Sequence, residues 1–318
     1  MTINITGTAF GSVVQVTDRL VTRTRPFGRF DSAANKNVIF LARDGLLTIG
    51  YTGLAYIGDQ PTDRWIARKL ALDESLQDDA MGAVQTAFRP PKRWMDVGRA
   101  MRHLAEELTN TWRRHACRIG GLEVFASGFQ WPASWKLARS RPVLWEIMSR
   151  RSRPQFDAVP IERYFGWERG RVTVAVLPKA LSDDSFQSLA EDLASAPTLD
   201  LIIDRMVDAV REAASENDAI GTDCMSIHVP SPRQSQEVTC RYMPSARPED
   251  VGAESLAYSP WIVAPDTRLA PTILNGFTLE VPSGPFNFKI VGSEEMSFEE
   301  DGSFEVFQSQ PRPPLPSR

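Results

Sequence analysis

The chain begins Met1-Thr2, so a hydroxyl-bearing residue lies one position from a removable start. If an aminopeptidase removes Met1, Thr2 carries both an alcohol and a free α-amine, whose reference pKa is about 7.7 to 8.0. An alcohol is a poor nucleophile near neutral pH unless a base takes its proton, and the amine of the same residue can do this. Thr2 is therefore a candidate nucleophile that needs no histidine.

Lys36 is a second candidate, because the chain uses lysine sparingly. Of its 36 basic residues, only six are lysines, a bias that codon usage explains most simply. An ammonium is a compact charge that can share protons near a nucleophile, whereas a guanidinium is broad and does not usefully deprotonate. Lys36 is thus either part of a reactive site or a solvated surface lysine.

Further residues follow Thr2 in a known order. Asp18-Arg19 supplies an acidic residue followed by arginine, the segment from Asn35 to Phe40 carries Lys36, and the segment from Leu46 to Ala55 ends in small residues. This order resembles the N-terminal-nucleophile hydrolases, and within them the proteasome β-subunit group. The resemblance covers roughly the first 75 residues. Residues 200–230 match more loosely, as a helix, an aspartate-containing turn and a glycine-led strand.

The resemblance implies a catalytic unit of Thr2, Asp18 and Lys36. In this unit the Thr2 α-amine takes the proton of Thr2 Oγ, and the Lys36 ammonium lowers the proton affinity of that amine. Asp18 holds and neutralises Lys36. Backbone N–H groups at Gly53, or at Tyr51 in the other register, are the implied donors to the oxyanion of the intermediate.

The later turn is implied to contribute Asp218 as the acid that steadies the amine, with Thr222 as a weaker companion. Each candidate also has an ordinary structural explanation. Thr2 suits a β-strand, and Asp18-Arg19 suits a surface pair worth under about 1 kcal/mol. Gly53 suits a turn, and Asp218 suits a loop after a helix. Taken together in one register, the residues favour the catalytic interpretation.

Two β-hairpins are expected to position the start of the chain. Residues 3–9 alternate apolar or small side chains with hydroxyl and amide side chains, which is typical of a strand with one buried face. Residues 13–16 form the returning strand. A second hairpin joins 38–42 to 46–51 through Asp44-Gly45, a favoured tight-turn dipeptide. We therefore expect four strands before any helix.

Helical spacing of apolar residues predicts four helices. Pro61 suits the start of the first, and residues 97–112 form the second; both should cover one sheet. A helix pair is expected over 182–194 and 199–214, broken at Pro197. Further strands are expected at 121–127, 171–177, 224–229 and 238–242.

These elements can bury their apolar faces as two stacked sheets between two helical layers. The periodicity predicts an α+β fold, and the family resemblance implies the four-layer αββα sandwich in particular. We expect an N-terminal-nucleophile-hydrolase-like domain at 1–245, with a Trp/Arg-rich insertion at about 130–168. A β-rich C-terminal extension, 246–318, ends in a proline-rich tail. Aromatic residues among arginines can stack on nucleic-acid bases, but they also pack insertions onto a domain edge or a partner.

The composition, 42% hydrophobic with a net charge of −4, is that of an ordinary soluble protein. No apolar run approaches the roughly 20 residues that span a bilayer, and the start does not have the pattern of a signal peptide, so we expect a cytoplasmic protein. Three cysteines without CxxC spacing and three scattered histidines predict buried thiols and neither a metal nor a cofactor. The acidic charge makes a nucleic-acid partner unexpected.

The sequence thus predicts a threonine-type hydrolase, a peptidase or amidase, that cleaves an amide bond with Thr2 after removal of Met1. Whether the substrate is a peptide or a small amide, and whether an unfoldase assists, stays open. The resemblance favours a homo-oligomer, although the insertion at 130–168 can block a closed ring. The alternative is a non-catalytic member of the fold that acts as a binding or assembly module.

Overall fold

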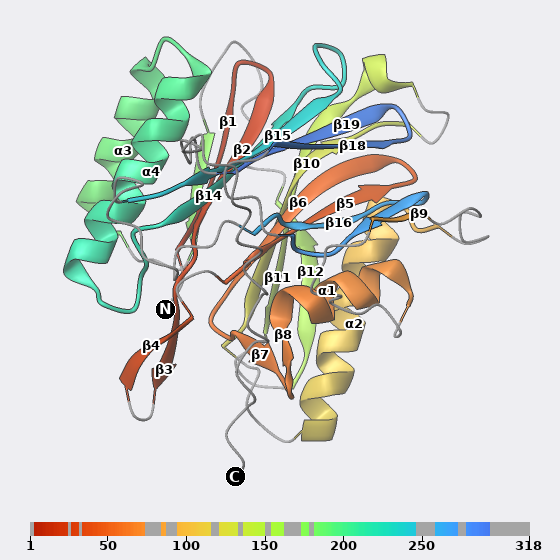
Figure 1. Ribbon diagram of the computed structural model, residues 1–318, viewed down its shortest axis with the longest axis horizontal. Coiled ribbons are helices and arrows are strands. Elements are labelled where there is room, and N and C mark those ends of the chain that lie inside the picture. Colours follow the sequence, from red (N-terminus) through yellow and green to blue (C-terminus); the bar gives the residue numbers. More distant parts are fainter. Residues whose placement is uncertain are drawn as a thin grey trace, which may run out of the picture.

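Two large β-sheets and four α-helices form the described part of the protein (Figure 1). The computed structural model describes residues 3–24, 27–31, 34–73, 84–86, 94–115, 121–132, 136–149, 154–161, 173–177, 181–245, 258–272 and 278–292. Helices α3 (Asp183–Ser195) and α4 (Leu199–Glu216) lie on one side of the sheets. Helices α1 (Thr62–Ala71) and α2 (Val97–His115) lie on the other side.

The first sheet has seven strands and carries the start of the chain. In spatial order they are β13 (Thr173–Leu177), β1 (Asn4–Ala9), β2 (Ser12–Asp18), β14 (Cys224–Pro230), β15 (Glu237–Met243), β19 (Phe286–Val291) and β18 (Thr278–Ser283). Neighbouring strands are antiparallel, apart from the parallel pair β15 and β19. Phe10 and Gly11 turn the chain between β1 and β2 with positive φ angles of 49° and 74°, the backbone that tight hairpins need.

The second sheet has eight strands. In spatial order they are β12 (Phe156–Pro160), β11 (Arg141–Ser149), β10 (Glu123–Gln130), β6 (Gly45–Thr52), β5 (Asn37–Ala42), β16 (Trp261–Val263), β17 (Thr267–Leu269) and β9 (Val84–Thr86). Strands β5 and β6 form the expected hairpin across Arg43 and Asp44. Asp44 Oδ1 accepts a hydrogen bond of 2.7 Å from Val97 N–H, which ties this turn to α2.

Two short hairpins lie before α1: β3 (Val21–Thr24) with β4 (Phe27–Asp31), and β7 (Tyr56–Ile57) with β8 (Gln60–Pro61). Eight strands therefore precede the first helix, so the expectation of four was wrong. The missed strands are only two to five residues long, and none shows the regular apolar alternation that predicts a strand. A short 3-10 helix at Leu137–Arg139 completes the elements.

Strand β1 is buried on both faces, whereas its alternation predicted one buried face. Ile3 and Ile5 pack against α3 and α4 in one hydrophobic cluster. Thr6, on the opposite face, accepts a hydrogen bond from Gln15 Nε2, and Gln15 Oε1 accepts one from Thr48 Oγ1 of β6. The polar residues of β1 therefore face the second sheet rather than water, because buried polar groups are retained where they can be hydrogen-bonded.

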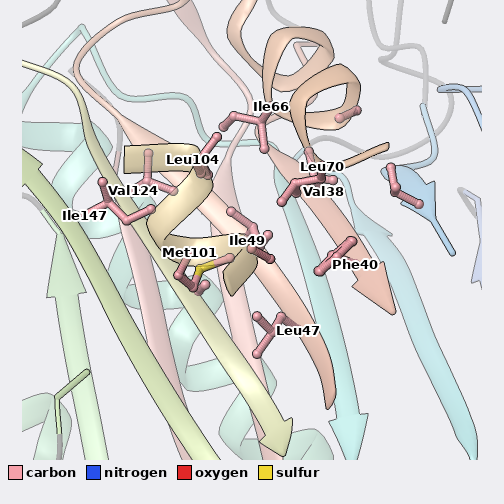
Figure 2. Close-up of a cluster of buried hydrophobic side chains, with 14 of the residues drawn as sticks. Val38, Phe40, Leu47, Ile49, Ile66, Leu70, Met101, Leu104, Val124 and Ile147 are labelled. Carbon is pink, nitrogen blue, oxygen red and sulfur yellow. The ribbon is translucent and has the colours of Figure 1, made fainter. Parts of the chain in front are cut away.

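Helices α1 and α2 cover the second sheet, as expected. Their apolar residues interdigitate with the sheet in one buried cluster (Figure 2). The labelled members are Val38, Phe40, Leu47, Ile49, Ile66, Leu70, Met101, Leu104, Val124 and Ile147. Burial of each such side chain contributes about 1.5–3 kcal/mol relative to exposure. On the other side, Ser182 and Thr198 cap α3 and α4 through their hydroxyl oxygens, which fits the break expected at Pro197.

The prediction of a mixed fold in which helices pack on sheets is confirmed. The finer four-layer arrangement and the boundary between 245 and 246 stay predictions. Strands beyond that boundary enter both sheets, since β16 pairs with β5 and β19 pairs with β15. The expected insertion at 130–168 contributes β11 and β12 to the second sheet.

Two tryptophans of the insertion pack inward. Trp131 is buried and stacks on Phe286 with ring centroids 5.6 Å apart, and Trp145 packs against the cluster of Figure 2. Trp135 and Trp167 lie outside the described residues. These two described tryptophans serve the core.

The expectation of buried thiols is confirmed for Cys224 and Cys240, which are free and buried. Burial raises the pKa of both thiols. Cys117 lies outside the described residues. Among the described helices, none is long and apolar enough to cross a membrane.

Candidate active site

A buried carboxylate organises the candidate site. Asp18, at the end of β2, is fully buried, and its Oδ1 accepts a hydrogen bond of 2.9 Å from Ile3 N–H. Its Oδ2 accepts bonds from Leu20 N–H at 3.2 Å and Gly221 N–H at 3.1 Å. The surface-pair explanation is therefore wrong for Asp18, because charge-assisted bonds from the backbone hold its carboxylate inside the fold.

Lys36 pairs directly with this carboxylate. Its Nζ lies 2.9 Å from Asp18 Oδ2 and 2.6 Å from the Leu20 carbonyl oxygen, and the side chain is 2% exposed. The solvated-lysine explanation is thus wrong as well. A buried ammonium needs a counter-charge and acceptors, since an unpaired charge in the interior is strongly unfavourable.

The start of the chain is anchored at the same point. Ile3 N–H belongs to the peptide bond that joins Thr2 to Ile3, and this group donates to Asp18. Thr2 itself lies outside the described residues. The structure brings together Asp18, Lys36 and the residue that follows Thr2.

The later turn contributes its backbone rather than the expected carboxylate. Gly221 N–H reaches Asp18, and a Cβ at Gly221 would lie 2.7 Å from Leu20 Cβ, so this approach requires glycine. Asp218 is exposed in the turn after α4. Thr222 is also exposed and donates its hydroxyl proton to Ser245 Oγ at 3.0 Å. Neither side chain takes part in the bonds to Asp18.

Gly53 is the first residue after β6 and has a φ of +95°, which favours glycine. A Cβ at this position would lie 1.8 Å from the Gly121 carbonyl oxygen. Tyr51, the other candidate, lies within β6 opposite Val124, and its hydroxyl donates to the Asn35 carbonyl oxygen at 3.2 Å. The backbone at Gly53 is thus locally constrained by close packing.

Arg19 reinforces the strand that carries Asp18. Its guanidinium lies 4.9 Å from the ring centroid of Tyr242, and the side chain is 1% exposed. The Tyr242 hydroxyl donates to Asp223 Oδ2 at 2.9 Å, while Arg19 N–H donates to the Asp223 carbonyl oxygen at 3.1 Å. These contacts join the ends of β2, β14 and β15.

A narrow crevice of about 10 Å³ is lined in part by Asn35, the residue before Lys36. Its lining residues are Val21, Ala34, Asn35, Tyr51, Ala55, Tyr56, Pro61 and Asp63. Asp63 is 1% exposed and accepts bonds from Asn35 Nδ2 at 3.3 Å and Trp261 Nε1 at 3.1 Å. The crevice therefore has a carboxylate wall and the volume of about one water molecule.

No protein-family model and no curated protein matches the chain. Several solved structures resemble it. The helical assembly of the Anbu complex from Pseudomonas aeruginosa has 10% identity and a TM-score of 0.51, covering 78% of this chain and 88% of that chain. The fold is proteasome-like. Anbu, an ancestral beta-subunit, from Yersinia bercovieri gives 10% identity and a TM-score of 0.46, with coverage of 73% and 83%.

The expected assignment to the proteasome β-subunit group was wrong, because the similar structure with a TM-score of 0.51 is an Anbu protein, of a distinct family. A Gly-1 mutant of Anbu from Hyphomicrobium sp. strain MC1 has 11% identity and a TM-score of 0.49, over 78% of this chain and 90% of that chain. A short motif such as Asp18-Arg19 does not by itself identify a family within a fold.

Sequence reasoning missed the backbone groups that complete the site. These are the Leu20 carbonyl and the N–H groups of Ile3 and Gly221. Every residue except proline has both backbone groups, so the residue type does not reveal which of them take part in the site. Gly221 offered a signal, since a glycine at the start of a strand often permits close approach of two backbones. Asp63 and Trp261 are far apart in the sequence, and only the packing of α1 against β16 joins them.

Proposed function

We propose that the protein is a hydrolase that cleaves an amide bond with the hydroxyl of Thr2 after removal of Met1. The observation that carries this proposal is the buried pair of Asp18 and Lys36, which is bonded to the N–H of the residue after Thr2. A lysine paired with a carboxylate beside the residue that follows a candidate threonine nucleophile suits nucleophilic catalysis. A mere structural role for the pair does not require this placement.

In the proposed reaction, Thr2 Oγ attacks the carbonyl carbon of the amide while the Thr2 α-amine takes the hydroxyl proton. The resulting oxyanion collapses, the C–N bond breaks, and the ammonium passes its proton to the departing amine. The substrate acyl group is then an ester of Thr2, which water hydrolyses with the same amine as base. Lys36 favours the neutral amine by like-charge repulsion, and Asp18 balances the charge of Lys36.

Gly53 is the proposed source of an N–H donor to the oxyanion. Its position directly after β6 and its tightly packed backbone support this role, because such donors act best when they are preorganised. Asp218 is also proposed to steady the Thr2 amine. This role requires a conformation in which its exposed carboxylate turns toward that amine. The order αββα is also part of the proposal, supported by separate hydrophobic clusters on the outer faces and between the sheets.

The alternative is a non-catalytic binding or assembly module. The complete burial of Asp18 and Lys36 is consistent with this alternative, because a purely structural ion pair would also have all its hydrogen bonds inside the fold.

The helical assembly is a property of the Pseudomonas aeruginosa Anbu complex. For this chain a homo-oligomer is a proposal, which light scattering at micromolar concentration tests, and a strict monomer refutes it. A cytoplasmic location and a peptide or small-amide substrate also stay predictions.

The decisive experiment measures the N-terminus and its reactivity together. Intact mass should show that Met1 is removed, and a β-lactone should acylate Thr2, opening its ring and adding its full mass as an ester. Thr2→Ala should abolish this adduct without changing the melting temperature, while Thr2→Ser should retain part of the rate. Retention of Met1 on most molecules, or equal labelling of Thr2→Ala, would exclude the proposed chemistry.

A further inference from the structure

Two buried amides meet above Gly50, between the two sheets. Asn4 of β1 is 2% exposed and Asn37 of β5 is fully buried. Within the described part of the chain, Asn4 Nδ2 and Asn37 Oδ1 have no hydrogen-bond partner. One of these atoms is a donor and the other is an acceptor, and a buried group of either kind is costly to leave unsatisfied.

The geometry at Gly50 places these two atoms close together. A Cβ built on Gly50 would lie 1.8 Å from Asn4 Nδ2 and 3.2 Å from Asn37 Oδ1. The two atoms are therefore no more than 5.0 Å apart, the sum of these distances. A hydrogen bond between them needs a separation of about 3 Å, which lies within this bound. Glycine at position 50 leaves the space that the Asn4 amide occupies.

The other atoms of both amides are held in the same layer. Asn4 Oδ1 accepts a hydrogen bond of 3.4 Å from Thr6 Oγ1. Asn37 Nδ2 donates to Thr17 Oγ1 at 2.6 Å. In this arrangement Asn4 Nδ2, a donor, and Asn37 Oδ1, an acceptor, are the amide atoms left for each other.

The positions of the two amides in the chain relate them to the proposed site. Asn4, the first residue of β1, is two positions after Thr2 in the sequence, and Asn37 directly follows Lys36. Asn37 also donates a hydrogen bond to Thr17, the residue before Asp18. The two amides therefore lie at the start of β1, two residues after Thr2, and at the start of β5, directly after Lys36.

We propose that Asn4 and Asn37 are positioning residues that set the distance between Thr2 and Lys36. They form an amide pair across Gly50 that locks β1 against the β5 and β6 hairpin. This inference rests on the proposed function, because it assigns the pair to the alignment of Thr2. The amides act through Thr2 and Lys36 and do not contact the reacting atoms.

The test uses the full chain with Asn4→Ala, Asn37→Ala and the double variant, each acylated with the β-lactone. We expect each single variant to be labelled at least tenfold more slowly than the wild type. The double variant should be within about threefold of the slower single variant, because either single substitution already removes the interaction between the two amides. The pH at half-maximal labelling should also rise, because Lys36 is less well placed to repel the proton of the amine.

Ser127→Ala is the matched control. Ser127 of β10 is fully buried in the same sheet as Asn37, and its hydroxyl has no partner among the described residues. It is far from Thr2 and Lys36 in the sequence. Its labelling rate and pH profile should equal those of the wild type. If the alanine variants do not fold, Asn4→Ser and Asn37→Ser replace them with the same criteria, and thermal melts verify the fold of every variant.

The outcomes separate this inference from the proposed function. Folded asparagine variants that label within twofold of wild type with the same pH profile overturn the positioning role and leave Thr2 as the nucleophile. If the rate reductions of the two single variants multiply in the double variant, the two asparagines act independently, and this also overturns the proposed pair. A wild-type protein without Met1 that is not labelled at all overturns the proposed function, and the positioning role with it.

Discussion

Lys36 lies in a buried, closely bonded position. Its Nζ is 2.9 Å from Asp18 and 2.6 Å from the Leu20 carbonyl oxygen, in a position that is 2% exposed. We predict that Lys36→Arg slows Thr2 acylation at least tenfold, nearly as much as Lys36→Ala, although the formal charge is kept. A planar guanidinium places its donors differently and adds volume to a closed site.

The measurement is the rate of β-lactone labelling beside a thermal melt. A tenfold change corresponds to about 1.4 kcal/mol in the activation barrier. Lys289→Arg, on a partly exposed strand position, is the control that should be unchanged. A Lys36→Arg protein within about threefold of wild type would rule out the compact-ammonium role.

His228 makes a separate prediction about stability in acid. Its Nε2 lies 2.9 Å from Ser12 Oγ. Burial lowers the pKa of His228 from 6.5 to about 4, with a further lowering by Arg241 and an opposing effect of Asp200. The folded state therefore binds a proton less readily than the unfolded state. Stability should be complete above about pH 6.5 and fall as the pH decreases toward 4, by roughly 3 kcal/mol at most.

Urea unfolding between pH 7 and pH 4 measures this loss. In the His228→Gln variant, the part of the pH dependence that comes from His228 disappears, so its curve should be flatter over this range. Identical pH dependence in both proteins would show that His228 does not couple folding to protonation. Carboxylates contribute in both proteins, and the comparison removes their effect.

The end of strand β6 can be tested through its glycine. Gly53 has a φ of +95°, and a Cβ there would lie 1.8 Å from the Gly121 carbonyl oxygen. Gly58 has a similar φ of +67° but nothing within 4 Å of its would-be Cβ. We predict that Gly58→Ala costs about 1 kcal/mol of backbone strain, whereas Gly53→Ala costs at least about 2 kcal/mol more.

Chemical unfolding of the two variants measures this difference in the free energy of unfolding. Both alanines would have a positive φ, but only the Cβ at position 53 would collide with a neighbouring backbone atom. If both substitutions cost the same, the approach of the β6 end to Gly121 is not tight. Under the proposed function, Gly53→Ala should also slow labelling, because the backbone donor moves.

At the level of elements, long periodic segments were predictable and short or polar ones were not. Helix α2 and strand β1 follow strong periodicities, and their positions agree with the expectation. The β3 and β4 hairpin was missed because its strands are four and five residues long and show no regular apolar alternation. Alternation in β1 gave the correct strand but the wrong environment, since periodicity does not distinguish water from a buried polar layer.

The candidate site shows a similar division. Asp18 and Lys36 were predicted from residue type and order, and the structure joins them. Asp218 was predicted from the order of elements alone, and its carboxylate is exposed. A turn shortened by one or two residues changes the direction of every side chain in it, whereas strand positions are held by a ladder of hydrogen bonds.

At the scale of the whole molecule, the last strands bind the two sheets together. Strand β19 extends the first sheet beside β15, and β16 extends the second sheet beside β5. Phe286, Phe288 and Ile290 of β19 lie in the buried cluster between the sheets. The boundary at 245 therefore separates residues that share one core, which sequence composition alone does not reveal.

We predict that a chain ending at residue 245 does not fold. It lacks β16 to β19, so the β5 and β15 backbones lose their parallel partners and the inter-sheet cluster loses its β19 side chains. Each exposed phenylalanine or isoleucine costs about 1.5–3 kcal/mol, and several together exceed the usual stability of about 5–15 kcal/mol. Circular dichroism and thermal melting measure the outcome, with a chain ending at residue 292 as the control that retains every described strand. A cooperative melt of the 1–245 chain near that of the control would show that the C-terminal strands are a dispensable extension.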